Sequence, residues 1–333
     1  MRKSNIETLR LISMLFIVLS HWGGHGSWVD VDYSNLFNSA YLQYTQFLGE
    51  LGNFTFVLIT GYFLSTREEF KWGGVKRVVV DVKLYALIIW ALVLICGLTT
   101  FSWKSLLEAS FPIVFRQYWF VIPFLFVVLF SPFINRLLKN KTYLIIWFVG
   151  LTIIGAFLFL LNAFYYIKFI WIFCIWYSIG ALVRLNEWDV KMMNCSYIWD
   201  LILLSFIILP FLYIIGSDLL LVKSGIDIVP KSSQFWRYNP APILGGLGLF
   251  LLFSRMSFQS ERINNIAKST FAVYLISENP NIHPLLWKLP VFDNIYFIDS
   301  YFLIPLSIVI CMGIMSICIV VDNNISRVKS YIG

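Results

Sequence analysis

The feature that most constrains this chain is a series of apolar blocks, many of them close to 20 residues long. An α-helix rises about 1.5 Å per residue, so roughly 20 residues are needed to cross about 30 Å of hydrocarbon. Of the 333 residues, 59% are hydrophobic and only 13% are charged, whereas soluble domains are about 25% charged. The pattern predicts an all-α, polytopic membrane protein and excludes a soluble enzyme, a disordered chain and a secreted disulfide scaffold.

Ten apolar segments predict about ten transmembrane helices in a single membrane-embedded domain covering residues 1–333. The first, eighth and ninth segments are shorter than a full span and have glycine or proline in or beside them. Such segments are tolerated where they line a cavity or pack on protein. The predicted helices are Leu9–Trp22, Phe47–Leu64, Val78–Leu98, Tyr118–Leu138, Tyr143–Leu161, Ile167–Val183, Tyr197–Ile215, Pro242–Phe253, Ile263–Ser277 and Phe302–Val321.

The distribution of positive charge predicts the orientation of these helices. With the N-terminus inside, the inner segments carry 18 of the 25 lysines and arginines and the outer segments carry 7. Cytoplasmic loops are enriched in Lys and Arg, so both termini are predicted to be cytoplasmic. The net charge of +7 is then a signal of topology, and we expect no nucleic-acid partner.

The five cysteines predict neither a disulfide nor a metal site. Cys96, Cys174, Cys311 and Cys318 lie inside apolar blocks, and Cys195 lies in a short basic loop. No pair of cysteines occurs in exposed loops, and no His or carboxylate accompanies Cys311 and Cys318.

Two ionisable residues of the first predicted helix are candidates for function. Arg10 and His21 are eleven positions apart, which is three helical turns plus about 20°, so they share one face about 16 Å apart along the axis. Glu7 is one turn before Arg10 and can pair with it. An ionisable residue within a membrane segment is a functional candidate by default.

His21 has two readings. It is either a general base, because a neutral imidazole can accept a hydroxyl proton near pH 7, or a structural histidine bonded to a neighbouring helix or lying in the outer headgroup region. His25 lies one turn further out and ranks below His21.

The second long outer loop, Gly216–Ala241, contains candidates for binding a substrate. Trp236, Arg237 and Tyr238 place aromatic rings beside a charged group, a combination that suits the apolar face and the hydroxyl edge of a sugar. The alternative is an interfacial aromatic belt. The first long outer loop is Gly23–Gln46.

Several motifs in order along nearly the whole chain resemble those of the acyltransferase-3 family, integral membrane acyltransferases that modify bacterial surface and other glycans. The ten residues between Arg10 and His21 carry the first part of the resemblance. The remaining matches are Ile6–Ser13, Phe56–Leu64, Lys76-Arg77 with Lys83-Leu84-Tyr85, Tyr118-Trp119-Phe120 with Ser131-Pro132-Phe133, and Ser269–Ile276.

The chain departs from the family pattern after Ile276. The resemblance leads us to expect a histidine next, but the sequence continues Ser277, Glu278, Asn279. This departure leaves His21 as the stronger candidate for catalysis.

The resemblance implies an acyl-CoA donor, usually acetyl-CoA, on the cytoplasmic side of a bacterial plasma membrane, and no bound cofactor. The implied acceptor is a hydroxyl of a surface or lipid-linked polysaccharide, such as a capsule or exopolysaccharide. Arg10, Lys76, Arg77 and Lys83 lie at the predicted inner face, where cationic groups could hold the CoA phosphates. Their other reading is the positive-inside signal alone.

Glu278 is the second candidate for catalysis. It lies about 20 Å along the ninth predicted helix, a depth comparable with that of His21. A carboxylate there could orient the imidazole or accept a hydrogen bond from a sugar hydroxyl, or it could be a surface group at the helix exit. Asn279, the next residue, is a further candidate for binding the acceptor.

Two other classes of protein fit the same composition. A transporter or flippase for lipid-linked saccharides would be expected to show internal repeats, and none is evident. A surface-glycan polymerase would be expected to have a larger outer loop than Gly216–Ala241.

Overall fold

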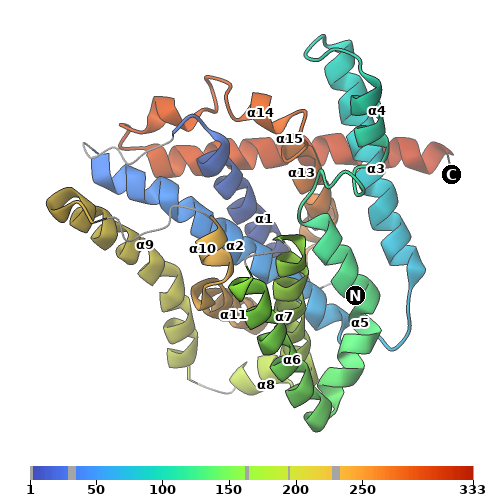
Figure 1. Ribbon diagram of the computed structural model, residues 1–333, viewed down its shortest axis with the longest axis vertical. Coiled ribbons are helices and arrows are strands. Elements are labelled where there is room, and N and C mark those ends of the chain that lie inside the picture. The colour runs from blue at the N-terminus through green and yellow to red at the C-terminus, as the bar shows by residue number, and fades with distance from the viewer. Residues whose placement is uncertain (1–2, 29–34, 162–164, 194–195, 227–232, 333) are drawn as a thin grey trace. The chain divides into compact units, whose positions relative to one another are not determined.

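The computed structural model describes residues 3–28, 35–161, 165–193, 196–226 and 233–332, and Figure 1 traces them. All regular structure within these ranges is helical, and eight helices are long and apolar enough to cross a membrane. The protein is therefore an all-α, multi-pass membrane protein, as predicted. Cys195 lies outside the described residues.

The eight long helices correspond to eight of the ten predicted segments. They are α1 (Ser4–His25), α2 (Leu36–Leu64), α3 (Trp72–Ile95), α5 (Val121–Lys139), α6 (Lys141–Leu160), α7 (Tyr165–Leu185), α9 (Ile198–Ser224) and α15 (Leu303–Ile332). The shorter elements are α4 (Trp103–Ser110), α8 (Trp188–Met193), α10 (Ser233–Arg237), α11 (Pro240–Arg255), α12 (Glu261–Ile266), η2 (Ala267–Ser269), α13 (Thr270–Ser277), α14 (His283–Leu286) and η3 (Asn294–Phe297).

The eighth and ninth predicted segments differ from the long helices. The eighth is α11, an apolar helix of 16 residues. The ninth is divided into α12, the 3₁₀ turn η2 and α13. Of the three segments predicted to be short, the first is wrong, since α1 has 22 residues and is long enough to span. The eighth and ninth correspond to a short helix and an interrupted one, the features expected where a segment packs on protein.

Much of the predicted loop Gly23–Gln46 is helical instead, because α2 begins at Leu36. Hydropathy ends the span near Phe47, since Asn38, Gln43 and Gln46 precede it. In the structure these amides have partners: Asn38 donates to Ile298 O and Ser300 O, Gln43 donates to Asp218 Oδ2, and Gln46 donates to Ser20 O. Buried amides with partners are compatible with a buried helix.

The predicted loop Gly216–Ala241 is also shorter than expected. Helix α9 continues to Ser224 and ends at Gly225, whose φ of 68° places it in the left-handed region that favours glycine. The short helix α10 follows, and Asn239 then caps α11 by accepting from the backbone N–H of Ala241.

The chain divides into two compact units. One consists of Met1–Thr55 and Ser196–Gly333, and the other of Phe56–Cys195. Helix α2 contributes its first part to the first unit and its last part to the second. That the whole chain acts as one membrane domain stays a prediction of the sequence.

In the first unit, α1 packs on α11, α12, α13 and α15, and α9 packs on α11. Gly248 of α11 allows the close contact between α11 and α9, since a Cβ there would meet the backbone of Leu203. Small residues commonly permit such approach between membrane helices. A buried ion pair, Arg255 Nε to Asp200 Oδ2 at 2.6 Å, joins the end of α11 to the start of α9.

In the second unit, α5 and α6 both pack on α7, and α3 pairs with α4 (Figure 1). Two glycines allow the end of α2 to lie close to α7. A Cβ at Gly61 would collide with Tyr177 O, and a Cβ at Gly180 would collide with Leu58 O. The buried Asp189 accepts from the Tyr62 hydroxyl at 2.6 Å, and Arg184 donates to the same hydroxyl.

Candidate active site

Arg10 and His21 lie on one continuous helix, α1, as the sequence predicted. Arg10 lies 3.4 Å from the buried carboxylate of Glu7, which confirms the predicted pair. The side chain of Arg10 is 21% exposed and that of His21 is 11% exposed. His25 is the last residue of the helix, one turn beyond His21.

The segment after α13 forms the opposite side of the site. Glu278 caps the C-terminus of α13. The Asn279 side chain then accepts from the backbone N–H of Asn281, and the Asn279 carbonyl accepts from those of Ile282 and His283. This turn returns the chain toward α1 and starts α14 at His283.

All three histidines of the sequence gather around Glu278. Glu278 Oε1 lies 3.2 Å from His21 Nδ1 and 3.2 Å from His25 Nε2. The His25 ring stacks on His283 with centroids 4.8 Å apart, and the centroids of His21 and His25 are 5.8 Å apart. The predicted contact between Glu278 and His21 is therefore present, and two further imidazoles accompany it.

The cluster becomes more exposed from His21 toward the end of α1. The side chains of His21 and Glu278 are 11% and 12% exposed, whereas that of His25 is 36% exposed. Burial, aided by repulsion from His25, lowers the pKa of His283 below its ordinary value although Glu278 opposes the shift. This shift favours the neutral form of His283 beside His25.

A clamp formed by Asp293 and Asn294 holds the end of α1. The carboxylate of Asp293 accepts from the backbone N–H and the hydroxyl of Ser27, at 2.8 and 2.5 Å. The amide of Asn294 donates to Trp22 O and accepts from the backbone N–H of Trp28, both at 3.0 Å. Both clamp residues are buried, so the histidines are held in register with the loop that carries Glu278.

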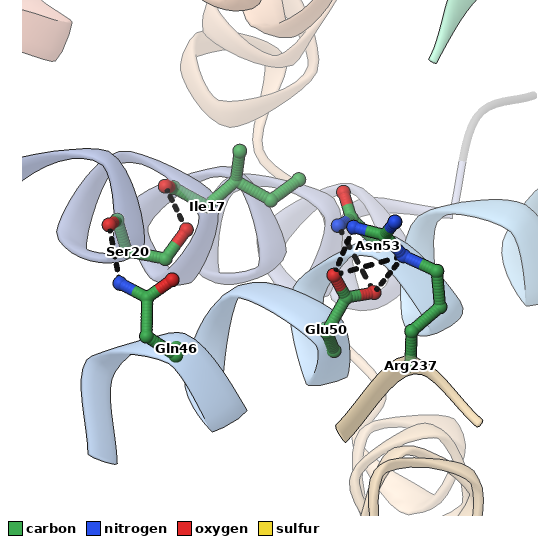
Figure 2. A network of polar contacts seen from close by, with 6 residues as sticks. All are labelled: Ile17, Ser20, Gln46, Glu50, Asn53 and Arg237. Atoms are coloured by element: carbon green, nitrogen blue, oxygen red, sulfur yellow. Dashed lines mark hydrogen bonds and ion pairs between the residues drawn. The ribbon is translucent and has the colours of Figure 1, made fainter. Parts of the chain in front are cut away.

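A second buried network lies between α2 and α10 (Figure 2). Arg237 Nη2 is 2.5 Å and Nε 3.1 Å from Glu50 Oε1, and Asn53 lies beside the pair. The side chains of Arg237 and Glu50 are only 6% and 2% exposed. One turn earlier on α2, Gln46 donates to Ser20 O next to His21, so a hydrogen bond joins the helix that carries Glu50 to the helix that carries His21.

The other candidates for binding a substrate are mostly buried. Trp236 is 3% exposed and packs against Phe47 and Phe235, while Tyr238 is half-buried. Asn279 is fully buried and organises the turn after Glu278. Contact of these residues with an acceptor stays a prediction, and the buried ring of Trp236 presents little surface to a sugar.

The predicted cationic residues fall in both units. Arg10 belongs to the first, whereas Lys76, Arg77 and Lys83 belong to α3 in the second. Lys76 and Lys83 are exposed, with Lys83 Nζ 5.5 Å from the centre of the Phe111 ring, and the Arg77 side chain is 83% exposed. The role of these exposed cations in holding CoA stays a prediction.

The sequence ranked His25 below His21 and did not single out His283 or Glu50, which the structure brings into the two buried networks. His25 follows His21 by four residues, the spacing that places two side chains on one helix face, and this was the available signal. Nothing local marks His283 or Glu50, since the ring stacked on His283 and the cation paired with Glu50 each lie more than 180 residues away in the chain. Among the described residues, no group of three or more His, Cys, Asp or Glu side chains is arranged to hold a metal ion.

The protein has membrane-spanning helices and a largely buried cluster of imidazoles around a carboxylate. It therefore belongs to the class of multi-pass membrane proteins with a candidate site for acid–base or nucleophilic chemistry. Comparison with protein families makes the class specific. A family model described as an acyltransferase domain matches residues 3–322, and the chain therefore belongs to the acyltransferase-3 family of membrane acyltransferases. No curated protein and no solved structure matches the chain significantly.

Proposed function

We propose that the protein is an O-acyltransferase that moves an acyl group, in the simplest case acetyl, from cytoplasmic acyl-CoA to a hydroxyl of a cell-surface or lipid-linked polysaccharide. The observation that carries the proposal is the contact between Glu278 and His21. A carboxylate 3.2 Å from Nδ1 favours the tautomer that bears a proton there, which leaves Nε2 of His21 as the reactive nitrogen.

The reaction forms one ester bond and breaks one thioester bond. The acceptor hydroxyl loses its proton, its oxygen bonds to the acyl carbon, and the carbon–sulfur bond to CoA breaks. The thiolate of CoA is released toward the cytoplasm. Nε2 of His21 either takes the hydroxyl proton as a general base or carries the acyl group transiently. In both cases Glu278 stabilises the positive charge that develops on the ring.

The donor is assigned to the inner end of α1. Arg10 is only partly exposed and lies about 16 Å along the helix axis from His21, so a thioester whose phosphates contact Arg10 extends toward the imidazole. Lys76, Arg77 and Lys83 of α3 are further candidates for the phosphates because guanidinium and ammonium groups bind them.

The acceptor is assigned to the outer side, where the positive-inside pattern places the end of α1. His25, His283 and the end of α13 lie at that end of the unit. A sugar hydroxyl arriving from outside would meet the histidine cluster without crossing the hydrocarbon. The family connection to bacterial surface glycans favours a polysaccharide or its lipid-linked precursor.

The test uses purified protein in nanodiscs with radiolabelled acetyl-CoA. The acceptor is the surface polysaccharide of the producing cells after mild alkali has removed its ester groups. We expect labelled, alkali-sensitive acetyl on the glycan from the wild type, and a loss on the order of 10²–10⁴-fold with His21→Ala. Normal transfer by a folded His21→Ala protein would refute the assignment of His21.

A cellular measurement tests the acceptor separately. The acetyl content of the glycan is compared by NMR in strains with and without the gene. An unchanged acetyl content, together with transport or polymerisation defects, would favour a flippase or a polymerase over the proposed transferase.

A further inference from the structure

We propose that His25 is a second catalytic histidine, the base that deprotonates the acceptor hydroxyl while His21 carries the acyl group. This inference deepens the proposed function and rests on it. It begins from one contact that His21 alone does not explain, the 3.2 Å approach of His25 Nε2 to the same Glu278 oxygen that faces His21 Nδ1.

The nitrogens that face Glu278 determine which nitrogens remain for chemistry. His21 faces the carboxylate with Nδ1, so its Nε2 is the reactive atom. His25 faces it with Nε2, so its Nδ1 is the reactive atom. Each imidazole therefore keeps one nitrogen for the reaction while Glu278 orients the other, which is the arrangement expected of a nucleophile or base held by a carboxylate.

Two such imidazoles allow the two half-reactions to use different residues. An imidazole that holds an acyl group cannot at the same time accept a proton at that nitrogen. The ring centroids of His21 and His25 are 5.8 Å apart, so the two imidazoles are close enough for one acceptor hydroxyl to reach both. Reacting groups held about 3 Å apart gain most of the benefit of proximity.

The balanced sequence has two steps. In the first, Nε2 of His21 forms a bond to the acyl carbon, the carbon–sulfur bond breaks, and the CoA thiolate leaves. In the second, the hydroxyl proton moves to Nδ1 of His25, the hydroxyl oxygen bonds to the acyl carbon, and the bond to His21 breaks. His21 is regenerated neutral, and His25 then releases its proton to water.

The surroundings of His25 suit this role. Its side chain is 36% exposed, compared with 11% for His21, so His25 has the better access to water for the final proton release. The titratable groups that interact with Glu278 here are His21, His25 and His283. Stacking on His283 fixes the plane of the His25 ring.

The experiment separates the half-reactions with His25→Phe. A phenyl ring retains the stacking surface for His283 but has no nitrogen. Without acceptor, we expect this variant to release about one CoA per protein molecule and to retain the acyl label on the protein, as the wild type does before hydrolysis. With the de-esterified polysaccharide, we expect its transfer to be slower by a factor on the order of 10².

His25→Gln, which keeps a polar group near Glu278, should behave in the same way. Lys288→Gln serves as the control, since Lys288 is an exposed titratable residue of the same loop and should transfer like the wild type. Addition of free imidazole should restore transfer to His25→Ala, because the truncated side chain leaves space for the ring beside His283, and a purely structural defect would not be restored.

Three outcomes would overturn the role of His25. They are transfer at the wild-type rate by His25→Phe, loss of the CoA burst in that variant, and absence of any acyl-protein in a wild type that transfers normally. A wild type that neither releases CoA nor labels glycan would instead refute the proposed function, so the two failures are distinguishable.

Discussion

The buried pair of Arg237 and Glu50 gives the sharpest prediction about stability. In Arg237→Ala the carboxylate of Glu50, 2% exposed, loses its cationic partner. Removing one partner of a buried ion pair costs about 3–5 kcal/mol because the remaining charge is uncompensated. Asn53 donates to Glu50 in the wild type and can still do so in the variant, so the carboxylate keeps one polar partner and the low end of this range applies. We therefore expect a loss of about 3 kcal/mol in the free energy of unfolding.

This loss converts to a shift in the thermal midpoint. An unfolding entropy of about 2.1 cal/mol/K per residue gives about 0.7 kcal/mol per degree for a chain of 333 residues. The midpoint should therefore fall by about 4 °C. A thiol-reactive fluorophore measures it, because Cys174, Cys311 and Cys318 are buried and become reactive only on unfolding, whereas the exposed Cys96 contributes to the baseline.

Two controls make the interpretation specific. Arg262→Ala removes an exposed arginine of the same unit and should leave the midpoint unchanged. The double substitution Glu50→Leu with Arg237→Met removes both charges at similar volume and should recover most of the loss. A midpoint for Arg237→Ala within about 1 °C of the wild type, or a double variant as unstable as the single one, would refute the reasoning. A stable Arg237→Ala protein with a raised KM for the polysaccharide would instead assign Arg237 to acceptor binding.

The other predictions concern the two ends of α1. Arg10→Ala should raise the KM for acetyl-CoA more than the KM for the polysaccharide, with Arg262→Ala as the exposed control, and an unchanged dependence on acetyl-CoA would contradict its role. Asn294→Ala should lower kcat about 10- to 100-fold, in the range typical when a group that orients a catalytic residue is lost, while the KM for acetyl-CoA stays constant. Asn294→Asp should not restore activity, because a carboxylate cannot donate to Trp22 O, and full activity of this variant would refute the clamp.

Membrane spans could be predicted because hydrocarbon imposes a length and a composition on each helix. The same constraint marked His21 and Glu278 as candidates for function, since burying an ionisable side chain at their depth has a free-energy cost unless another group interacts with it. Their contact could be anticipated from equal depth alone. The short eighth and ninth segments correspond to a 16-residue helix and an interrupted one.

What the sequence did not predict are the polar partners supplied from distant parts of the chain. Helix α2 begins eleven residues earlier than hydropathy suggests, since Asn38, Gln43 and Gln46 each bond to a separate element. Such pairs depend on which helices pack together, and neither helical periodicity nor local charge patterns encode that packing. The pairing of Glu50 with Arg237, 187 positions later, is unpredictable for the same reason.

The position of the histidines at the end of α1 has a physical explanation in the backbone. The last carbonyls of a helix have no partner within it and must be satisfied by other groups. Asn294 donates to Trp22 O, and its oxygen accepts from the backbone of Trp28, so one side chain closes the helix on both sides of His25. The residues that satisfy the end of α1 therefore also fix the distance from its histidines to Glu278. A substitution that removes these hydrogen bonds should lower kcat more than it lowers the stability of the fold.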